Sequence, residues 1–412
     1  MLKKIPVQSL IPGMVVSSLV GDPDHWHEPR LPLTIQTQAD VDRLRTLGVR
    51  DVYIDASLGA DLPEAVPRAD VVQDLERQLA ELGESEGSSA TRDEEVMERL
   101  TRNLTDAQAL RSQAEQAILK LMEQSRLGRR IDAVLVRATA QEMERSLRRD
   151  RDLLTSLVLL GSTDSTVYAH SVNVGVLMMA FSQTLDLPAD VAVELGVGGM
   201  LHDLGMARID SSMRDKPGKL SPAEYQRVRE HVALGLDVLS QSASMDPRAV
   251  TVMAQHHERQ DGLGYPQGLD GAEIHEYGRM AAIVDTFEAL TSHRPYRSAI
   301  PSFVAVRRML EWSAHHFDAG LYKHFVRTVG IYPVGTLVRL GNGVVGVVLK
   351  NSPDQLLYPV LRVVGDPRSV TAVSPYLLDL SRYRDDPDMR IEGCELPGRW
   401  NLNPARFLFG LL

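Results

Sequence analysis

Met200-Leu-His-Asp-Leu-Gly205 and Ala254-Gln-His-His-Glu-Arg259 are the two stretches of this 412-residue chain that decide its fold class. Each places two adjacent metal-ligating side chains inside a helical pattern of apolar residues. A single histidine in such a pattern is more often a hydrogen-bonded core residue. Adjacent His-Asp and His-His pairs are different, because burying so many polar groups without strong partners costs about 1–3 kcal/mol for each unsatisfied group. We therefore predict a helical domain that presents these pairs to a metal centre.

Further candidate ligands flank these pairs at intervals of about one helix and its connection. Consecutive helices of a bundle can therefore each present one or two ligands to a shared centre. The candidate ligands are His170, His202, Asp203, His231, His256, His257 and Asp285. Five imidazoles and two carboxylates exceed the need of one tetrahedral site, and they suit two divalent ions of the iron, manganese or nickel type. Asp203 is able to bridge the two ions and is the candidate catalytic residue.

Five other histidines of this region are expected to be ordinary hydrogen-bonded residues rather than ligands. They are His275, His293, His315, His316 and His324.

Together the motifs resemble the HD-GYP family of cyclic di-GMP phosphodiesterases. The resemblance is carried by His202-Asp203, by His256-His257-Glu258 with Asp261-Gly-Leu-Gly-Tyr-Pro266, and by Asp285-Thr-Phe-Glu-Ala-Leu-Thr-Ser-His-Arg-Pro-Tyr-Arg297. The first 60 residues resemble a small accessory domain that often precedes this family's catalytic domain. The resemblance implies a metal-dependent hydrolase of bacterial second-messenger signalling, which converts cyclic di-GMP to pGpG, GMP or both with a metal-bridged hydroxide as nucleophile.

The same resemblance implies which residues contact the substrate. Arg294 and Arg297 would face the phosphates, a role that suits the geometry of guanidinium groups. The loop beside the ligand would be formed by Gly262, Gly264, Tyr265 and Pro266. Its two glycines allow tight backbone turns, and Tyr265 is expected either to stack on a guanine or to donate its hydroxyl.

Two positions depart from the family pattern. Family members usually carry a lysine after the His-Asp motif, but here that place is taken by Met206, whose thioether cannot donate a proton or balance a phosphate charge. Lys216 or Lys219 could compensate, although lysines in a turn usually lie at the surface. Thr166 stands where some relatives carry a glutamate that helps to bind a third metal, which favours a two-metal centre.

Two alternatives to the phosphodiesterase remain open. The first is a cyclic di-GMP receptor that turns over poorly because of Met206. The second is a phosphohydrolase of the wider HD superfamily that acts on another nucleotide. The Gly-Tyr-Pro loop and the paired arginines favour cyclic di-GMP over other nucleotides.

The expected fold class is mainly α, with a helical-bundle catalytic domain between two smaller parts. The predicted parts are a small α/β domain over 1–60, a helical linker over 61–135, the catalytic domain over 136–332, and a β-hairpin extension with its tail over 333–412. The hairpin is predicted from two apolar stretches, 336–340 and 344–349, around Gly341-Asn-Gly343.

Composition and charge limit the partners. The net charge of −10 argues against broad attraction to a nucleic acid polymer or an anionic membrane. The single cysteine, Cys394, and the lack of a long apolar run suit a soluble protein of the reducing cytoplasm. A narrow apolar seam over residues 100–121 predicts either a homodimer through that helix or packing of the helix on the chain's own core.

Overall fold

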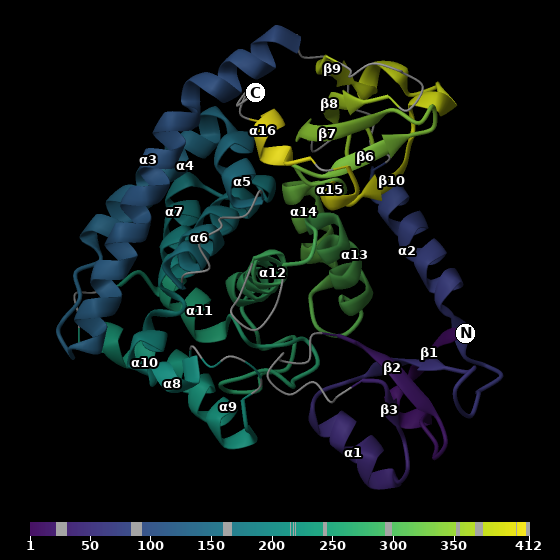
Figure 1. Cartoon of the computed structure of the whole chain (residues 1–412). Helices are drawn as coiled ribbons and strands as arrows, with labels where there is room; N and C mark the ends of the chain where they lie inside the picture. Colours follow the sequence, from purple (N-terminus) through teal and green to yellow (C-terminus); the bar gives the residue numbers. More distant parts are fainter. Residues whose placement is uncertain are drawn as a thin grey trace.

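In the computed structural model of this chain, two apolar helices, α6 (Val167–Thr184) and α7 (Ala189–Leu201), lie inside the helical bundle (Figure 1). Every residue of α6 from Ala169 to Ser182 is buried, as is every residue of α7 from Ala192 to Leu201. A side chain at Gly175 would lie 2.4 Å from Met200 Cγ and 2.9 Å from the Gly196 carbonyl oxygen. Glycine at this position therefore allows the two helices to pack closely.

The structure describes residues 1–21, 31–83, 93–159, 167–214, 216, 218, 220–241, 245–292, 299–351, 355–366, 374–400 and 402–408. In the long helix that starts at residue 93, side chains are described from residue 106 onward.

The other helices of the bundle surround this central pair. They are α3 (Asp93–Arg126), α4 (Val134–Arg149), α5 (Arg151–Leu159), η2 (Leu204–Arg208), α8 (Ser211–Arg214), α9 (Pro222–Arg229), α10 (His231–Ser240), α11 (Pro247–Gln255), α12 (Glu276–Thr291), α13 (Ser302–Trp312) and α14 (Ala319–Val329). One continuous apolar core runs through the bundle. The predicted mainly helical fold is confirmed.

Helix α3 lies along the outside of the bundle (Figure 1). Described apolar residues of its seam belong to the core of the bundle. Ala107, Ala114, Ala117 and Leu121 are all buried in the same core as α6 and α7. This part of the seam therefore packs on the chain's own core, the second of the two alternatives. The homodimer stays a prediction.

The N-terminal part is a five-stranded sheet with one helix. The strands are β1 (Leu2–Pro6), β2 (Val15–Val20), β3 (Leu33–Thr34), β4 (Asp51–Asp55) and β5 (Val66–Pro67), in the order β3-β2-β4-β1-β5, and the helix is α1 (Gln38–Thr46). A separate small core around Ile5, Met14 and Ile54 holds sheet and helix together. The small α/β domain is as predicted, and its edge strand β5 extends the sheet beyond residue 60.

The C-terminal part is larger than the predicted hairpin. The hairpin is present as β6 (Leu337–Leu340) and β7 (Val345–Lys350), joined through Gly343 at a φ of +86°. Three more strands complete an antiparallel sheet of order β10-β6-β7-β8-β9: β8 (Val360–Gly365), β9 (Tyr376–Asp379) and β10 (Ile391–Glu395). Strand β10 and the short helices α15 (Pro397–Trp400) and α16 (Pro404–Leu408) lie in the tail to which the sequence assigned no structure.

Helix α2 (Arg68–Gly83) runs between the two sheets along one side of the bundle (Figure 1). Gly83, at its end, abuts Leu357 of the C-terminal part. The N-terminal sheet meets the bundle through Tyr53, whose hydroxyl donates a hydrogen bond of 2.8 Å to Glu311 on α13. The three parts are thus held together by direct contacts as well as by the chain.

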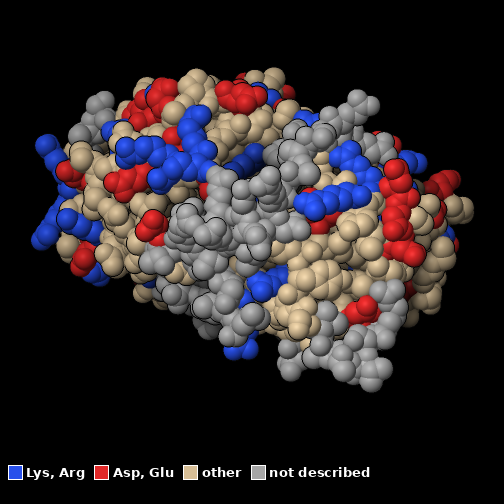
Figure 2. Space-filling view, turned by 90° about the horizontal axis from the view of Figure 1, so that it is seen from above, with Lys and Arg blue, Asp and Glu red and all other residues tan. Residues whose placement is uncertain are grey.

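Among the described residues no helix is both long enough and apolar enough to cross a membrane. On the face seen in Figure 2, Lys and Arg side chains lie beside Asp and Glu side chains rather than forming one continuous basic surface.

Candidate metal centre

Five helices bring all seven predicted ligands to one place. His170 comes from α6, His202 and Asp203 follow the end of α7, His231 begins α10, His256 and His257 follow the end of α11, and Asp285 comes from α12. Their ligand atoms form three overlapping groups, each with all of its atoms within 4.8 Å of one another. The sequence prediction that these residues cluster is confirmed in the structure, and their role as ligands is taken up below.

Three of the histidines share one arrangement at the end of a helix. In each, ring Nδ1 faces the backbone carbonyl oxygen three residues earlier: His202 to Gly199 at 2.7 Å, His231 to Val228 at 2.8 Å and His256 to Met253 at 2.8 Å. Carbonyl groups in the last turn of a helix have no partner within the helix, so the ring N–H satisfies them. Because a carbonyl oxygen only accepts, Nδ1 carries the proton and Nε2 is left as the ligand atom.

This arrangement also has an electrostatic consequence. The C-terminal ends of α7, α9 and α11 all point toward the cluster, and each carries a partial negative charge from its unpaired carbonyl groups. Three such ends favour a cation among the histidines.

Asp203 lies between two groups of histidines. Its Oδ2 is 3.7 Å from Nε2 of His170 and 3.5 Å from Nε2 of His202, while its Oδ1 is 3.4 Å from Nε2 of His231. Burial alone would raise the pKa of this carboxyl group, but the neighbouring histidines outweigh it and hold the pKa well below its usual range. An ionised carboxylate with one oxygen toward each group has the geometry of a bridging ligand.

Asp285 is placed in a similar way on the other side. Its Oδ1 lies 3.1 Å from Nε2 of His170 and 3.6 Å from Nε2 of His202, and its Oδ2 lies 3.9 Å from Nδ1 of His257. Burial is again outweighed, here by the neighbouring His170 and His202, and the pKa of Asp285 lies well below its usual range.

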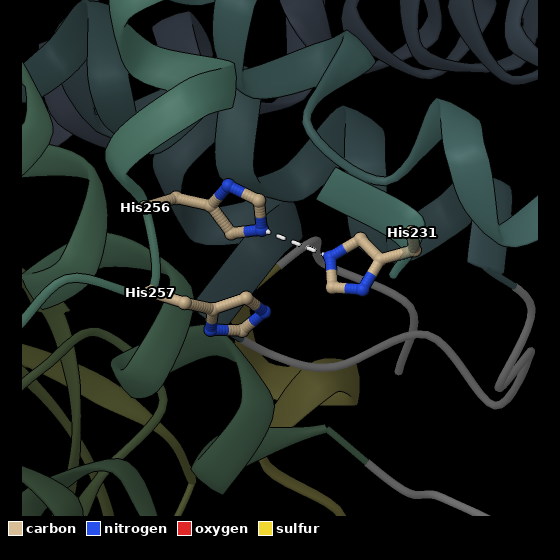
Figure 3. A group of neighbouring side chains, drawn as sticks. All are labelled: His231, His256 and His257. Carbon is tan, nitrogen blue, oxygen red and sulfur yellow. Dashed lines mark hydrogen bonds between the residues drawn. The ribbon is translucent and has the colours of Figure 1, made fainter. Parts of the chain in front are cut away.

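The ring nitrogens fit divalent cations on direct chemical grounds. Nε2 of His231 and Nε2 of His256 face each other at 3.3 Å (Figure 3). Burial lowers the pKa of both rings, so both are neutral, and the proton of each sits on Nδ1. Two lone pairs then point at each other, an arrangement that a cation between them would stabilise. Nε2 of His202 is likewise buried and lacks a hydrogen-bond partner among the described residues.

The Gly-Tyr-Pro loop turns back on the His-His pair. Gly262 has a φ of +71°, and a side chain at Gly264 would lie 2.5 Å from the Arg259 backbone nitrogen and 2.6 Å from the His257 carbonyl oxygen. Both glycines are therefore required by the backbone, as predicted. Glu258, which is buried, accepts hydrogen bonds from the backbone N–H groups of Gln267 and Leu269 and so fixes the far side of the loop.

Tyr265 is drawn into the centre by this loop. Its ring stacks on His257 with centroids 4.4 Å apart and an angle of 28° between the planes, and only 8% of the residue is exposed. The guanidinium carbon of Arg229 lies 4.3 Å from the same ring centroid. His257 and Arg229 thus occupy much of the ring surface that was expected to stack on a guanine, and the role of Tyr265 toward substrate stays a prediction.

Several predicted positions lie outside the described residues. They are Arg294, Arg297, Thr166 and Lys219. Lys216 is described and forms an ion pair of 2.8 Å with Glu224, as expected for a lysine engaged at the surface. Met206 packs against a small apolar cluster of Ile209, Leu220, Tyr225 and Val228.

Glu288 is a residue of the centre that the sequence analysis did not single out. It is 1% exposed, and its carboxylate contacts Nδ1 of His170 and accepts a hydrogen bond of 2.8 Å from the amide of Asn173. One signal was available, because Glu288 lies three residues after Asp285 and therefore on the same face of α12.

Two family profiles match the chain. That of the HD domain covers residues 139–321, and that of a domain of unknown function (DUF3391) covers residues 2–135. A cyclic di-GMP phosphodiesterase of Pseudomonas aeruginosa is 38% identical over 404 residues, which is 97% of this chain and 94% of the relative. The chain belongs to the HD-GYP family.

Other relatives match over only part of their length. A cyclic di-GMP phosphodiesterase of Thermotoga maritima is 30% identical over 165 residues, 40% of this chain and 45% of the relative. A 3'3'-cGAMP-specific phosphodiesterase of Vibrio cholerae is 34% identical over 142 residues, 34% of this chain and 31% of the relative. The relatives of this chain thus include phosphodiesterases named for more than one cyclic dinucleotide substrate.

Proposed function

We propose that this HD-GYP protein hydrolyses cyclic di-GMP in bacterial second-messenger signalling. The observation that carries the proposal is the P. aeruginosa relative named for that activity, whose likeness extends over nearly the whole of both chains. The convergence of all seven candidate ligands beside the Gly-Tyr-Pro loop supports it, since it gives this chain the means to hold the ions that such a hydrolase needs.

Two divalent ions, iron or manganese, would be held by two sets of histidines, His170 with His202 and His231 with His256 and His257. The carboxylates of Asp203 and Asp285 each face both sets. Bound there, such ions would lower the pKa of a water molecule and stabilise negative charge on a phosphate group. The protein's own contribution is to fix the ring nitrogens, through the backbone carbonyl groups that accept from Nδ1, and to keep the centre largely buried. Arg294 and Arg297 are the proposed partners of the substrate phosphates.

The test is metal content measured together with turnover on anaerobically purified protein reconstituted with iron or manganese. Cyclic di-GMP, 3'3'-cGAMP and linear pGpG are the substrates to compare, and Asp203→Asn is the inactive control. About two ions per chain with release of pGpG or GMP from cyclic di-GMP supports the proposal. Preferential hydrolysis of 3'3'-cGAMP would move the assignment to that nucleotide.

The receptor is the second candidate function, and Met206 is the observation that favours it. Two ions per chain with tight binding of cyclic di-GMP but no product would support the receptor. A chain that binds no metal would contradict both functions.

A further inference from the structure

Arg229 is a partly buried cation without an acidic partner in the described part of the chain. It is the last residue of α9 and precedes the ligand His231 by two positions. Its guanidinium carbon lies 4.3 Å from the ring centroid of Tyr265 and 5.6 Å from that of Tyr225. No described carboxylate lies within ion-pair distance of it, whereas its helix neighbour Arg227 pairs with Glu230 at 2.7 Å.

The contrast with Arg259 strengthens the point. Arg259 starts the Gly-Tyr-Pro loop, but its guanidinium is fully engaged by a two-point contact with Asp261 at 3.0 and 2.7 Å. Arg229 has no such contact, so its N–H groups remain available to an incoming anion. Stacking on an aromatic ring orients a guanidinium without consuming its N–H donors.

The position of Arg229 relative to the metal centre indicates which anion it would meet. Tyr265 contacts both Arg229 and His257, with the rings of Tyr265 and His257 4.4 Å apart. Arg229 therefore lies one aromatic ring away from the ligand cluster. A group bound at the cluster and extending past Tyr265 would bring its next charged atoms to the guanidinium.

We propose that Arg229 binds a phosphate group of the cyclic dinucleotide and is a substrate-binding residue of this enzyme. The inference rests on the proposed function and extends it. A guanidinium fork matches two oxygen atoms of a phosphate, so the contact adds orientation as well as charge. It also gives this chain a cation close to the apolar cluster that contains Met206 and Tyr225, at a place where the thioether supplies none.

The test compares Arg229→Gln with Arg227→Gln on the full-length, metal-loaded protein. Arg227 lies on the same helix, is 64% exposed and is already paired, so its variant controls for loss of a positive charge from α9. The readouts are metal content and the Kd for a phosphorothioate analogue of cyclic di-GMP that resists hydrolysis. Arg229→Gln should raise the Kd about tenfold or more with metal content unchanged, and Arg227→Gln should leave both unchanged.

Arg229→Lys separates binding from support of Tyr265. It keeps the charge but not the planar fork, so its Kd should fall between those of the native protein and Arg229→Gln. Native affinity for the analogue in Arg229→Gln would overturn the proposal. Equal loss of metal in Arg229→Gln and Arg229→Lys would also overturn it, because Arg229 would then only hold the loop. Failure of the unaltered protein to bind the analogue would instead overturn the proposed function, and the inference with it.

Discussion

The carboxylate of Glu288 on α12 accepts the hydrogen bond of the protonated Nδ1 of His170 on α6, so this histidine presents Nε2 to the candidate metal centre. The other three histidines with this orientation use backbone carbonyl groups for the same purpose. A carboxylate differs from a carbonyl in carrying a full charge, which makes the imidazole a stronger donor to a cation. Glu288 is itself held by Asn173 and by the hydroxyl of Ser292, which donates at 2.6 Å.

We predict that Glu288→Gln weakens metal binding about 10- to 100-fold, the usual cost of losing such a partner. A glutamine amide can also donate to Nδ1, which would move the proton to Nε2 and remove the ligand lone pair. Metal affinity, measured by competition with a chelator of known strength, checks this. Glu276→Gln is the matched control, because Glu276 lies exposed in the first turn of the same helix; an equal effect in both variants would speak against the role of Glu288.

Gly264→Ala is expected to disrupt the loop. The added methyl group would lie 2.5–2.6 Å from backbone atoms of Arg259, Glu258 and His257, none of which can move as a flexible side chain would. The loop must shift, taking Tyr265 and His257 with it, so turnover should fall by at least about tenfold and metal content should drop. Gly398→Ala meets no atom within 4 Å and serves as the control. Native turnover in Gly264→Ala would show that the loop position is not needed.

Removing the metals should destabilise the protein. A metal ion that binds only to the folded chain adds about 2.7 kcal/mol to the free energy of unfolding when its free concentration is 100 times its Kd. Without cations, the facing lone pairs of His231 and His256 are left buried together. We expect chelation to lower the Tm and manganese to restore it, as followed by thermal denaturation. An unchanged Tm would mean that these residues do not hold a cation.

The parts of the site that lie close together in the sequence could be predicted. The contacts between residues that are far apart in the sequence could not. Adjacent pairs such as His202-Asp203 indicate metal ligands, because both residues lie in one helical pattern of apolar residues. The roles of Glu288 and Arg229 depend instead on which helix lies opposite, toward His170 in one case and Tyr265 in the other. Such pairings leave no local pattern.

The same reason limits the prediction of the C-terminal part. The hairpin β6–β7 has a short turn signal at Gly341-Asn-Gly343 and was predicted. Strand β10 pairs with β6 from about fifty residues further along the chain, so no turn residue marks the pairing.

Acid should weaken the contact between the N-terminal domain and the loop. His316 is 6% exposed and faces Arg259, Asp261, His315 and Arg50; burial, reinforced by Arg259, lowers its pKa to about 3. Arg259 also reaches the Gly48 carbonyl oxygen of the N-terminal domain at 3.4 Å.

Because an unfolded histidine has a pKa of about 6.5, the unfolded chain binds one more proton than the folded chain between about pH 6.5 and pH 3. Stability contributed by neutral His316 is therefore present above about pH 6.5 and is lost as the pH falls, by about 2 kcal/mol at pH 5. Urea unfolding of His316→Gln should show a pH dependence smaller by that amount. His315→Gln, at an exposed neighbour, should retain the native dependence; identical curves for all three proteins would contradict the assignment.

Met206→Lys tests whether the missing lysine limits this enzyme. Position 206 is partly exposed at the edge of the apolar cluster that includes Tyr225, so a lysine there can extend its amino group toward solvent and substrate. If Arg229 already supplies a cation on this side of the centre, a second one adds little, and turnover should rise by less than about threefold. In the Arg229→Gln background the same lysine should restore a larger share of the lost turnover, because it then supplies the positive charge that the first substitution removed. Steady-state kinetics of the four combinations measure this coupling. A large gain from Met206→Lys in the otherwise native chain would instead mark a protein whose catalysis is limited by Met206 itself, and would favour the receptor function.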